Sequence, residues 1–185
     1  MPRVKHVKAR KDYPDQGIKK GDMYYIARMK TGPRSSKTIR SLDPIPQSRL
    51  TSSAFLSGWY SAEEEWARSN KDAEAIRAAA EAIETLGQEA QESFDNMPEG
   101  LQQGDTGQLL ENRVSEAERI AGELETLADD LEGLTEPEEM EDPGDGMDED
   151  AQEAWEQWQE ENDHYQSEIA RIPEEVESLL SEVPE

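Results

Sequence analysis

From Gln47 to the end of the chain, apolar residues recur at steps of three and four. This spacing puts them on one side of an α-helix and is typical of amphipathic helices that pack against one another. Pro98 ends one such segment, and Pro173 begins the last. The pattern predicts five helices, at about residues 47–69, 71–97, 105–134, 148–172 and 174–183.

Short connectors join these segments, and a short connector returns a helix alongside the one before it. We therefore expect an antiparallel helical bundle or long coiled-coil hairpins. Small residues of the second segment, such as Ala80 and Gly87, would complement the large Trp155 and Trp158 of the fourth. The same apolar stripes would also suit self-association, so a homo-oligomer is an alternative use of them.

The first 46 residues follow a different pattern. The stretch "DMYYIARM" (22–29) has the aromatic and β-branched content of a strand, "KTGPRSS" supplies a turn, and "KTIRS" can form the returning strand. Pro44 and Pro46 then disfavour any continued strand or helix. The sequence thus predicts a mainly α protein, with a β-hairpin head and Pro-rich linker in residues 1–46 and a helical body in residues 47–185.

Charge separates the two parts more sharply. The chain has a formal net charge of -25 and only 34% apolar residues, so burial should follow narrow seams between helices. Residues 1–50 hold 13 of the 19 Lys and Arg and four Asp, a net charge of +9. The other 135 residues hold six cations and 40 acids, a net charge of -34. This asymmetry indicates an anionic partner for the basic part, unless that part docks on the acidic body.

Several kinds of site are excluded or unsupported. The chain has no cysteine, which excludes thiolate ligands and cysteine nucleophiles. The histidines, His6 and His164, lie far apart and belong to no local metal motif. The sequence has neither a Gly-rich phosphate loop nor a Gly-x-Ser-x-Gly elbow, and no apolar run approaches the ~18 residues of a membrane span. We expect a non-enzymatic protein without cofactor, metal or membrane contact.

Cations and tyrosines alternate in the head, and this is the most specific functional pattern in the chain. Lys and Arg can contact phosphates while a phenol ring stacks on a base. The alternative is that the tyrosines fill a small core and the cations form a solvated face. The predicted ligand-binding residues are Lys19, Lys20, Tyr24, Tyr25, Arg28, Lys30, Arg34, Lys37 and Arg40.

The same region carries a resemblance. The stretches "KARKDYP" (8–14), "GIKKGDMYY" (17–25), "SKT" (36–38) and "SRLTSSAFLS" (48–57) resemble a group of bacteriophage-encoded proteins of unassigned function. The resemblance covers roughly the first third of the chain and brings no catalytic residues with it. It implies an accessory viral protein that acts in the cytoplasm of a bacterial host.

Two functions follow from these patterns. In the first, the head binds a nucleic acid or a small nucleotide, for example to counter a host defence, while the acidic body repels nonspecific polyanions. In the second, Glu and Asp on rigid helices imitate the phosphates of DNA and occupy a basic surface of a host protein. The concentration of cations in the head favours the first.

Overall fold

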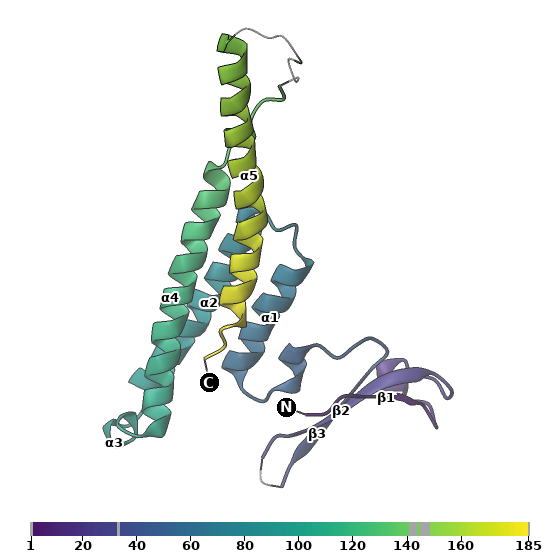
Figure 1. The fold of residues 1–185 in the computed structure, drawn as a ribbon. Helices are drawn as coiled ribbons and strands as arrows, with labels where there is room; N and C mark the ends of the chain where they lie inside the picture. The colour runs from purple at the N-terminus through teal and green to yellow at the C-terminus, as the bar shows by residue number, and fades with distance from the viewer. Residues whose placement is uncertain (1, 33, 141–143, 145–148, 185) are drawn as a thin grey trace.

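A small sheet lies at one end of a set of long helices (Figure 1). The computed structural model describes residues 2–32, 34–140, 144 and 149–184. The head contains β1 (Lys5–Lys8), the 3-10 helix η1 (Pro14–Gln16), β2 (Met23–Lys30) and β3 (Ser36–Ser41). The body contains η2 (Gln47–Leu50), α1 (Ala54–Arg68), α2 (Ala73–Asp95), α3 (Glu99–Gln102), α4 (Asp105–Gly133) and α5 (Glu149–Ser181). The prediction of a mainly α protein with a small β head is confirmed.

The head sheet has three antiparallel strands in the order β1-β2-β3. The predicted hairpin corresponds to β2 and β3, which pair from Tyr25 opposite Ser41 to Lys30 opposite Ser36. The sequence analysis missed β1, which pairs Lys5 with Ile26 and Lys8 with Met23. This edge strand has the sequence "KHVK", and Val7 is its one apolar side chain. Four residues with one apolar side chain carry too little alternation to indicate a strand.

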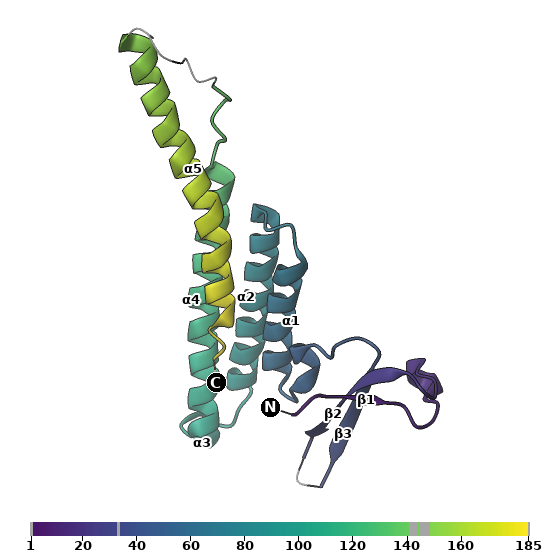
Figure 2. The same cartoon turned by 45° about the vertical axis from the view of Figure 1, so that its right-hand side comes forward.

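The long helices α1, α2, α4 and α5 form most of the body, and each of these runs in the opposite direction to the long helix before it (Figures 1 and 2). A single core of buried residues passes through α1, α2, α4 and α5. The predicted seams of α2 and α4 supply much of this core, including Ile76 and Ile83 on α2 and Leu124 on α4, all of them fully buried. The body core is separate from the two small clusters of buried residues in the head.

Small residues let neighbouring helices approach closely. A Cβ atom added to Gly87 of α2 would lie 3.0 Å from the Cβ of Ala117 on α4, so the partner of this small residue is another small residue. The prediction that Trp155 and Trp158 complement α2 is wrong. These two rings stack on each other, with centroids 4.9 Å apart, and the indole Nε1 of Trp158 donates to the Glu138 carbonyl at 2.7 Å.

The predicted break at Pro173 is also wrong, because α5 continues through this residue. Proline inside a helix lacks a backbone N–H and clashes with the preceding turn, which costs about 3 kcal/mol. Packing compensates here, since Ile172 and Val176 on either side of Pro173 are fully buried. The predicted start of this helix at residue 148 lies outside the described residues.

The predicted start of the first helix at about residue 47 is wrong, whereas the bounds of α2 and α4 lie within two residues of the predicted ones. Side-chain caps fix two helix starts. Residues 47–50 form the 3-10 helix η2, and α1 begins only after Ser53, whose Oγ accepts a hydrogen bond from the Leu56 N–H at 3.3 Å. Asp72 caps α2 in the same way, by accepting from the Ala75 N–H at 2.8 Å. Such caps satisfy backbone donors that a helix start leaves unpaired.

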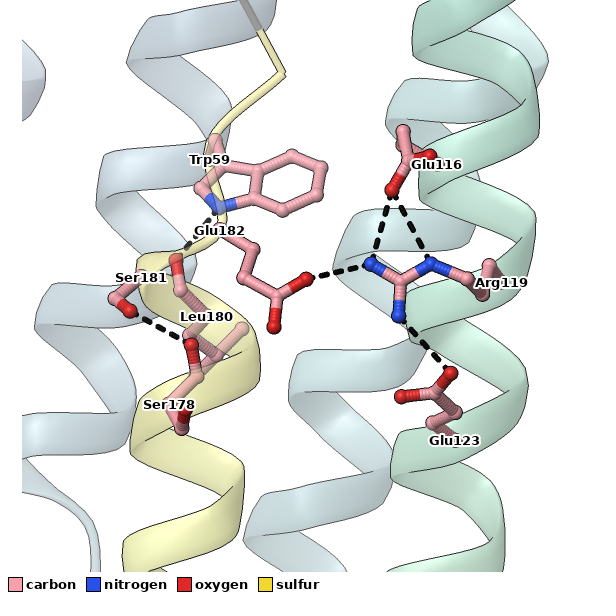
Figure 3. Close-up of polar contacts among 8 residues, drawn as sticks. All are labelled: Trp59, Glu116, Arg119, Glu123, Ser178, Leu180, Ser181 and Glu182. Carbon is pink, nitrogen blue, oxygen red and sulfur yellow. Dashed lines mark hydrogen bonds and ion pairs between the residues drawn. The ribbon is translucent and has the colours of Figure 1, made fainter.

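Polar contacts fix the C-terminal end of α5 against two helices (Figure 3). The indole Nε1 of Trp59 on α1 donates to the Leu180 carbonyl at 2.8 Å, in the buried core. On the other side, Arg119 of α4 pairs with Glu182 at 2.6 Å and with Glu116 and Glu123 on its own helix. The body thus holds its C-terminal helix through one buried hydrogen bond and one surface charge network.

Candidate nucleic-acid interface

The two faces of the head sheet differ in what they contact. Side chains alternate between faces along a strand, and directly paired residues share a face. Tyr25, Ala27 and Met29 therefore lie on one face, together with Ile39 of β3. This inner sheet face packs on the linker residue Ile45 and on Leu50 of η2. It attaches the sheet to the start of the body.

The opposite face carries a row of cations. We call it the outer sheet face and define it by Lys5, Tyr24, Ile26, Arg28, Lys30, Thr38 and Arg40. Lys5, Arg28 and Lys30 are exposed, and Arg40 is half-buried. Residues of one face are about 7 Å apart along a strand, and strands are about 5 Å apart, so these cations form an array. The array has the sign and the spread that a polyanion requires.

Tyr24 lies within this face but has no free ring. It is 5% exposed and packs with Ala9 and Ile18 in a small cluster. Burial raises the pKa of Tyr24 above its usual value, and the neighbouring Tyr13 raises it further. The phenol therefore stays protonated at neutral pH. Tyr24 acts as a core residue that supports the face, not as a stacking platform.

The two tyrosines beside it are also engaged. Tyr25 stacks on His6 with ring centroids 4.4 Å apart and planes 16° from parallel. The guanidinium of Arg40 lies 4.6 Å from the centre of the Tyr13 ring, and the Lys11 ammonium lies 5.5 Å from it. The rings of Tyr13 and Tyr25 are thus already in contact with other side chains of the head. The alternative that the tyrosines fill a small core agrees with these contacts.

The remaining predicted residues are spread around the sheet. Lys19 and Lys20 lie in the turn before β2, where their backbone N–H groups donate to Asp22 and Asp12. Arg34 lies in the turn between β2 and β3, and Lys37 pairs with Met29 at the end of the inner face. All four side chains are exposed. The structure thus brings together Tyr24, Arg28, Lys30 and Arg40 of the predicted set, and it adds Lys5.

The cations of the head and of the body differ in whether they form ion pairs. Within residues 2–32, 34–140, 144 and 149–184, the Lys and Arg that pair with carboxylates are Arg68, Arg77, Arg119 and Arg171, and all of them lie in the body. Among the head cations in the same ranges, Arg28 Nε donates to Ser36 Oγ at 3.0 Å, and Arg40 hydrogen-bonds to the phenol of Tyr24. The hypothesis that the head docks on its own acidic body therefore finds no ion pair among these residues.

Several hollows border the cations, including one of about 470 Å³ beside Arg28, Lys30 and Arg34. Another, of about 590 Å³, lies over the outer face beside Lys8, Arg10 and Tyr13. A third, of about 490 Å³, lies between β2 and the start of the body. We call this third hollow the junction cleft, and it is lined by Arg28, Met29 and Lys30 of the head and by Leu50, Leu56 and Tyr60 of the body, among others.

Lys5 and Tyr60 border these surfaces and were absent from the predicted set. The pairing of Lys5 with Ile26 places it on the outer face, and only the register of β1 reveals this. Tyr60 belongs to α1, and it lines the same cleft as residues of β2 only because the chain folds this way. No local sequence pattern indicates this neighbourhood. The sequence shows that the head is basic. Only the strand pairing shows which cations share one face of the sheet.

The part of the chain that the structure describes contains no group of three or more His, Asp or Glu side chains that could hold a metal ion. None of the helices in that part is both long enough and apolar enough to cross a membrane.

Comparison of the sequence with protein-family models and with curated proteins, and of the fold with solved structures, finds no match.

Proposed function

We propose that the head binds nucleic acid through the phosphate backbone, with Lys5, Arg28, Lys30 and Arg40 as its contacts on the outer sheet face. The observation that carries this proposal is the absence of carboxylate partners for these cations among the described residues, in a chain with 44 acids. Cations that pair with no acid keep their full charge for a ligand. A phosphate array recruits several such cations at once and releases its counterions.

The state of the tyrosines indicates which nucleic acid to test. Tyr13 and Tyr24 are in a ring contact or buried, and Tyr25 on the inner face stacks on His6, so the described tyrosines of the head offer no free ring to a base. Contacts to phosphates fix a protein on a nucleic acid but carry no sequence information directly. We therefore expect the outer face to bind duplex DNA with little preference for base sequence.

A triple substitution tests the proposal. Lys5→Gln, Arg28→Gln and Lys30→Gln together remove three exposed charges from the outer face, and fluorescence anisotropy of a labelled duplex measures the effect. We expect the affinity at low salt to fall by about tenfold or more, because each lost cation frees a phosphate to keep its counterion.

The matched control makes the same change in net charge in the body. Arg77→Gln, Arg119→Gln and Arg171→Gln remove three cations that already pair with carboxylates. This variant should bind the duplex almost as the native protein does, apart from a small long-range effect of charge. Equal losses in both variants would show that binding follows net charge alone and would contradict the proposed face.

The resemblance to bacteriophage proteins gives this activity a biological setting, which we propose together with it. An accessory protein in the cytoplasm of an infected bacterium would meet both viral and host nucleic acid. Its acidic body, with 40 acids after residue 50, would keep the rest of the molecule away from the same polyanion. Interference with a host defence that acts on nucleic acid is the role that fits such a protein.

The acidic body supports a second candidate, in which it occupies a basic protein surface. The described ion pairs engage eight of its acids, and Glu118 and Glu125 of α4 are among the exposed acids outside those pairs. Glu118→Gln with Glu125→Gln lowers the negative charge of α4 and preserves the Arg119 network. If the body mimics DNA, this variant should displace duplex DNA from a basic DNA-binding protein less well than the native chain does.

A further inference from the structure

The junction cleft combines the features of a small-ligand site. Its volume of about 490 Å³ is within the usual range of about 300–1,000 Å³ for such sites, and it lies where the head meets the body. Met29, Leu50 and Leu56 give it apolar walls, and no Asp or Glu lines it. In a chain of net charge -25, a cleft with two cations and no acid favours an anion.

The strand pairing explains why the cleft is open. The central strand β2 extends to Lys30, but β1 pairs with it only as far as Ile26. Residues 27–30 therefore have β3 on one side and no strand on the other, within the described residues. Arg28 and Lys30 line the cleft together with Pro2 of the head and with residues at the start of the body.

Tyr60 supplies the aromatic surface that the head tyrosines lack. It is half-buried, it lines the cleft, and among the described residues no ring and no cation lies over it. A phenol ring offers a face on which a base can stack, and this contact contributes about 1–3 kcal/mol per base. The free ring and the free cations thus lie around one cavity.

We infer that the junction cleft binds a nucleoside phosphate, with the base against Tyr60 and the phosphate near Arg28 and Lys30. This inference deepens the proposed function, since it shares these two cations with the outer face, but it adds a base contact that the outer face does not have. The nucleotide would come either from solution or from the unpaired end of a nucleic-acid strand.

Isothermal titration with AMP, adenosine and inorganic phosphate tests the cleft directly. We expect AMP to bind more tightly than either fragment, because only AMP contacts both the ring and the cations. Tyr60→Leu should weaken AMP binding by about fivefold or more, the factor that corresponds to the weakest base stacking. AMP binding no tighter than phosphate binding, or no detectable AMP binding at millimolar concentration, would overturn the inference.

A second variant fills the cleft without changing its charge. Leu56→Trp adds bulk to the wall and should abolish AMP binding, while Leu101→Trp makes the same substitution at a site that is 59% exposed and away from the cleft. Circular dichroism shows whether each variant keeps its helices. AMP binding that survives in a folded Leu56→Trp protein would place the nucleotide elsewhere and contradict the inference.

Two duplexes distinguish the source of the base and separate this inference from the proposed function. A duplex with a single-stranded overhang should bind the native protein more tightly than a blunt duplex if the cleft takes a strand end, and Tyr60→Leu should remove that difference. The blunt duplex should bind Tyr60→Leu and the native protein equally. Blunt-duplex binding without any Tyr60-dependent effect of AMP or overhang refutes the cleft alone, and AMP binding without duplex binding refutes the outer face alone.

Discussion

The Lys and Arg side chains of the head and of the body differ in their contacts. In the body, four of the seven Lys and Arg pair with carboxylates among the described residues, and two others, Lys71 and Arg113, lie 3.9 Å and 4.7 Å from the centres of aromatic rings. In the head, none of the 12 Lys and Arg has a carboxylate partner among the described residues. The net charge of the whole chain therefore says little about what the head can bind.

The hydrophobic cores differ as well. One continuous core joins four helices of the body, whereas the head has a small cluster on each side of a three-stranded sheet. Large cores are stabilised by many mutual contacts, and small ones depend on a few side chains. Substitutions in the two cores should consequently show that the body is the more stable region and the head the more easily unfolded one.

The largest expected effect is in the body core. Trp59 is 0% exposed and donates to the Leu180 carbonyl, so Trp59→Ala leaves a large cavity and an unpaired acceptor. We expect the free energy of unfolding to fall by about 3–5 kcal/mol. Urea denaturation followed by helical circular dichroism measures this change. A loss below about 1 kcal/mol would show that α5 is not held as described.

A smaller effect is expected in the head, at Ile18. This side chain is 1% exposed and packs with Tyr24 in the apolar cluster on the outer face. Ile18→Ala should destabilise the head by about 2–3 kcal/mol. Hydrogen exchange should then speed up in residues 5–41 and stay unchanged in α2 and α4. Equal acceleration in both regions would mean that the head and the body unfold as one unit.

The smallest expected effect on stability is at Glu63 of α1. A substitution there tests how much the burial of a charged group costs in the body. Burial raises the pKa of Glu63, and Glu64 and Glu177 raise it further. The folded state holds this proton more tightly than the unfolded state does, so stability falls as the pH rises from the unfolded-state pKa through the folded one. Glu63→Gln should therefore raise the melting temperature slightly at pH 7.

The same variant should lose its advantage in acid. Below a pH of about 4, the carboxyl is protonated in both states, and the native and variant proteins should melt alike. Glu65→Gln, at an exposed position two residues away, is the control for a general change in net charge. A gain that persists in acid, or that Glu65→Gln reproduces, would contradict the effect of burial at Glu63.

Much of the body could be predicted from spacing, because each helix buries a regular stripe. The seam from Ile76 to Ala90 and the helix from Asp105 are examples in which the sequence period and the packing agree. Pro173 was misjudged because local propensity indicates a break, whereas buried residues on both sides stabilise one continuous helix. Tertiary packing decided the result at that residue.

The candidate site was harder to predict. Composition indicated a basic head, but β-strand alternation sends Tyr24 and Tyr25 to opposite faces, and the edge strand β1 was too short to detect. The ring contacts of Tyr13 and Tyr25 depend on residues that the sequence does not show to be neighbours. Tyr60 is far from the head in the sequence and lies beside it only in the folded structure. The positive charge of the head could be inferred from composition, whereas the positions of its side chains on the sheet could not.

The most direct test of the central claim is the salt dependence of duplex binding. The logarithm of the affinity should fall linearly with the logarithm of the salt concentration, for the native protein and for the variant that combines Lys5→Gln, Arg28→Gln and Lys30→Gln. If these three side chains each neutralise one phosphate, the slope of the variant should be smaller by about 2–3. Identical slopes, or no duplex binding by the native protein at low salt, would contradict the claim that the outer sheet face binds the nucleic-acid backbone.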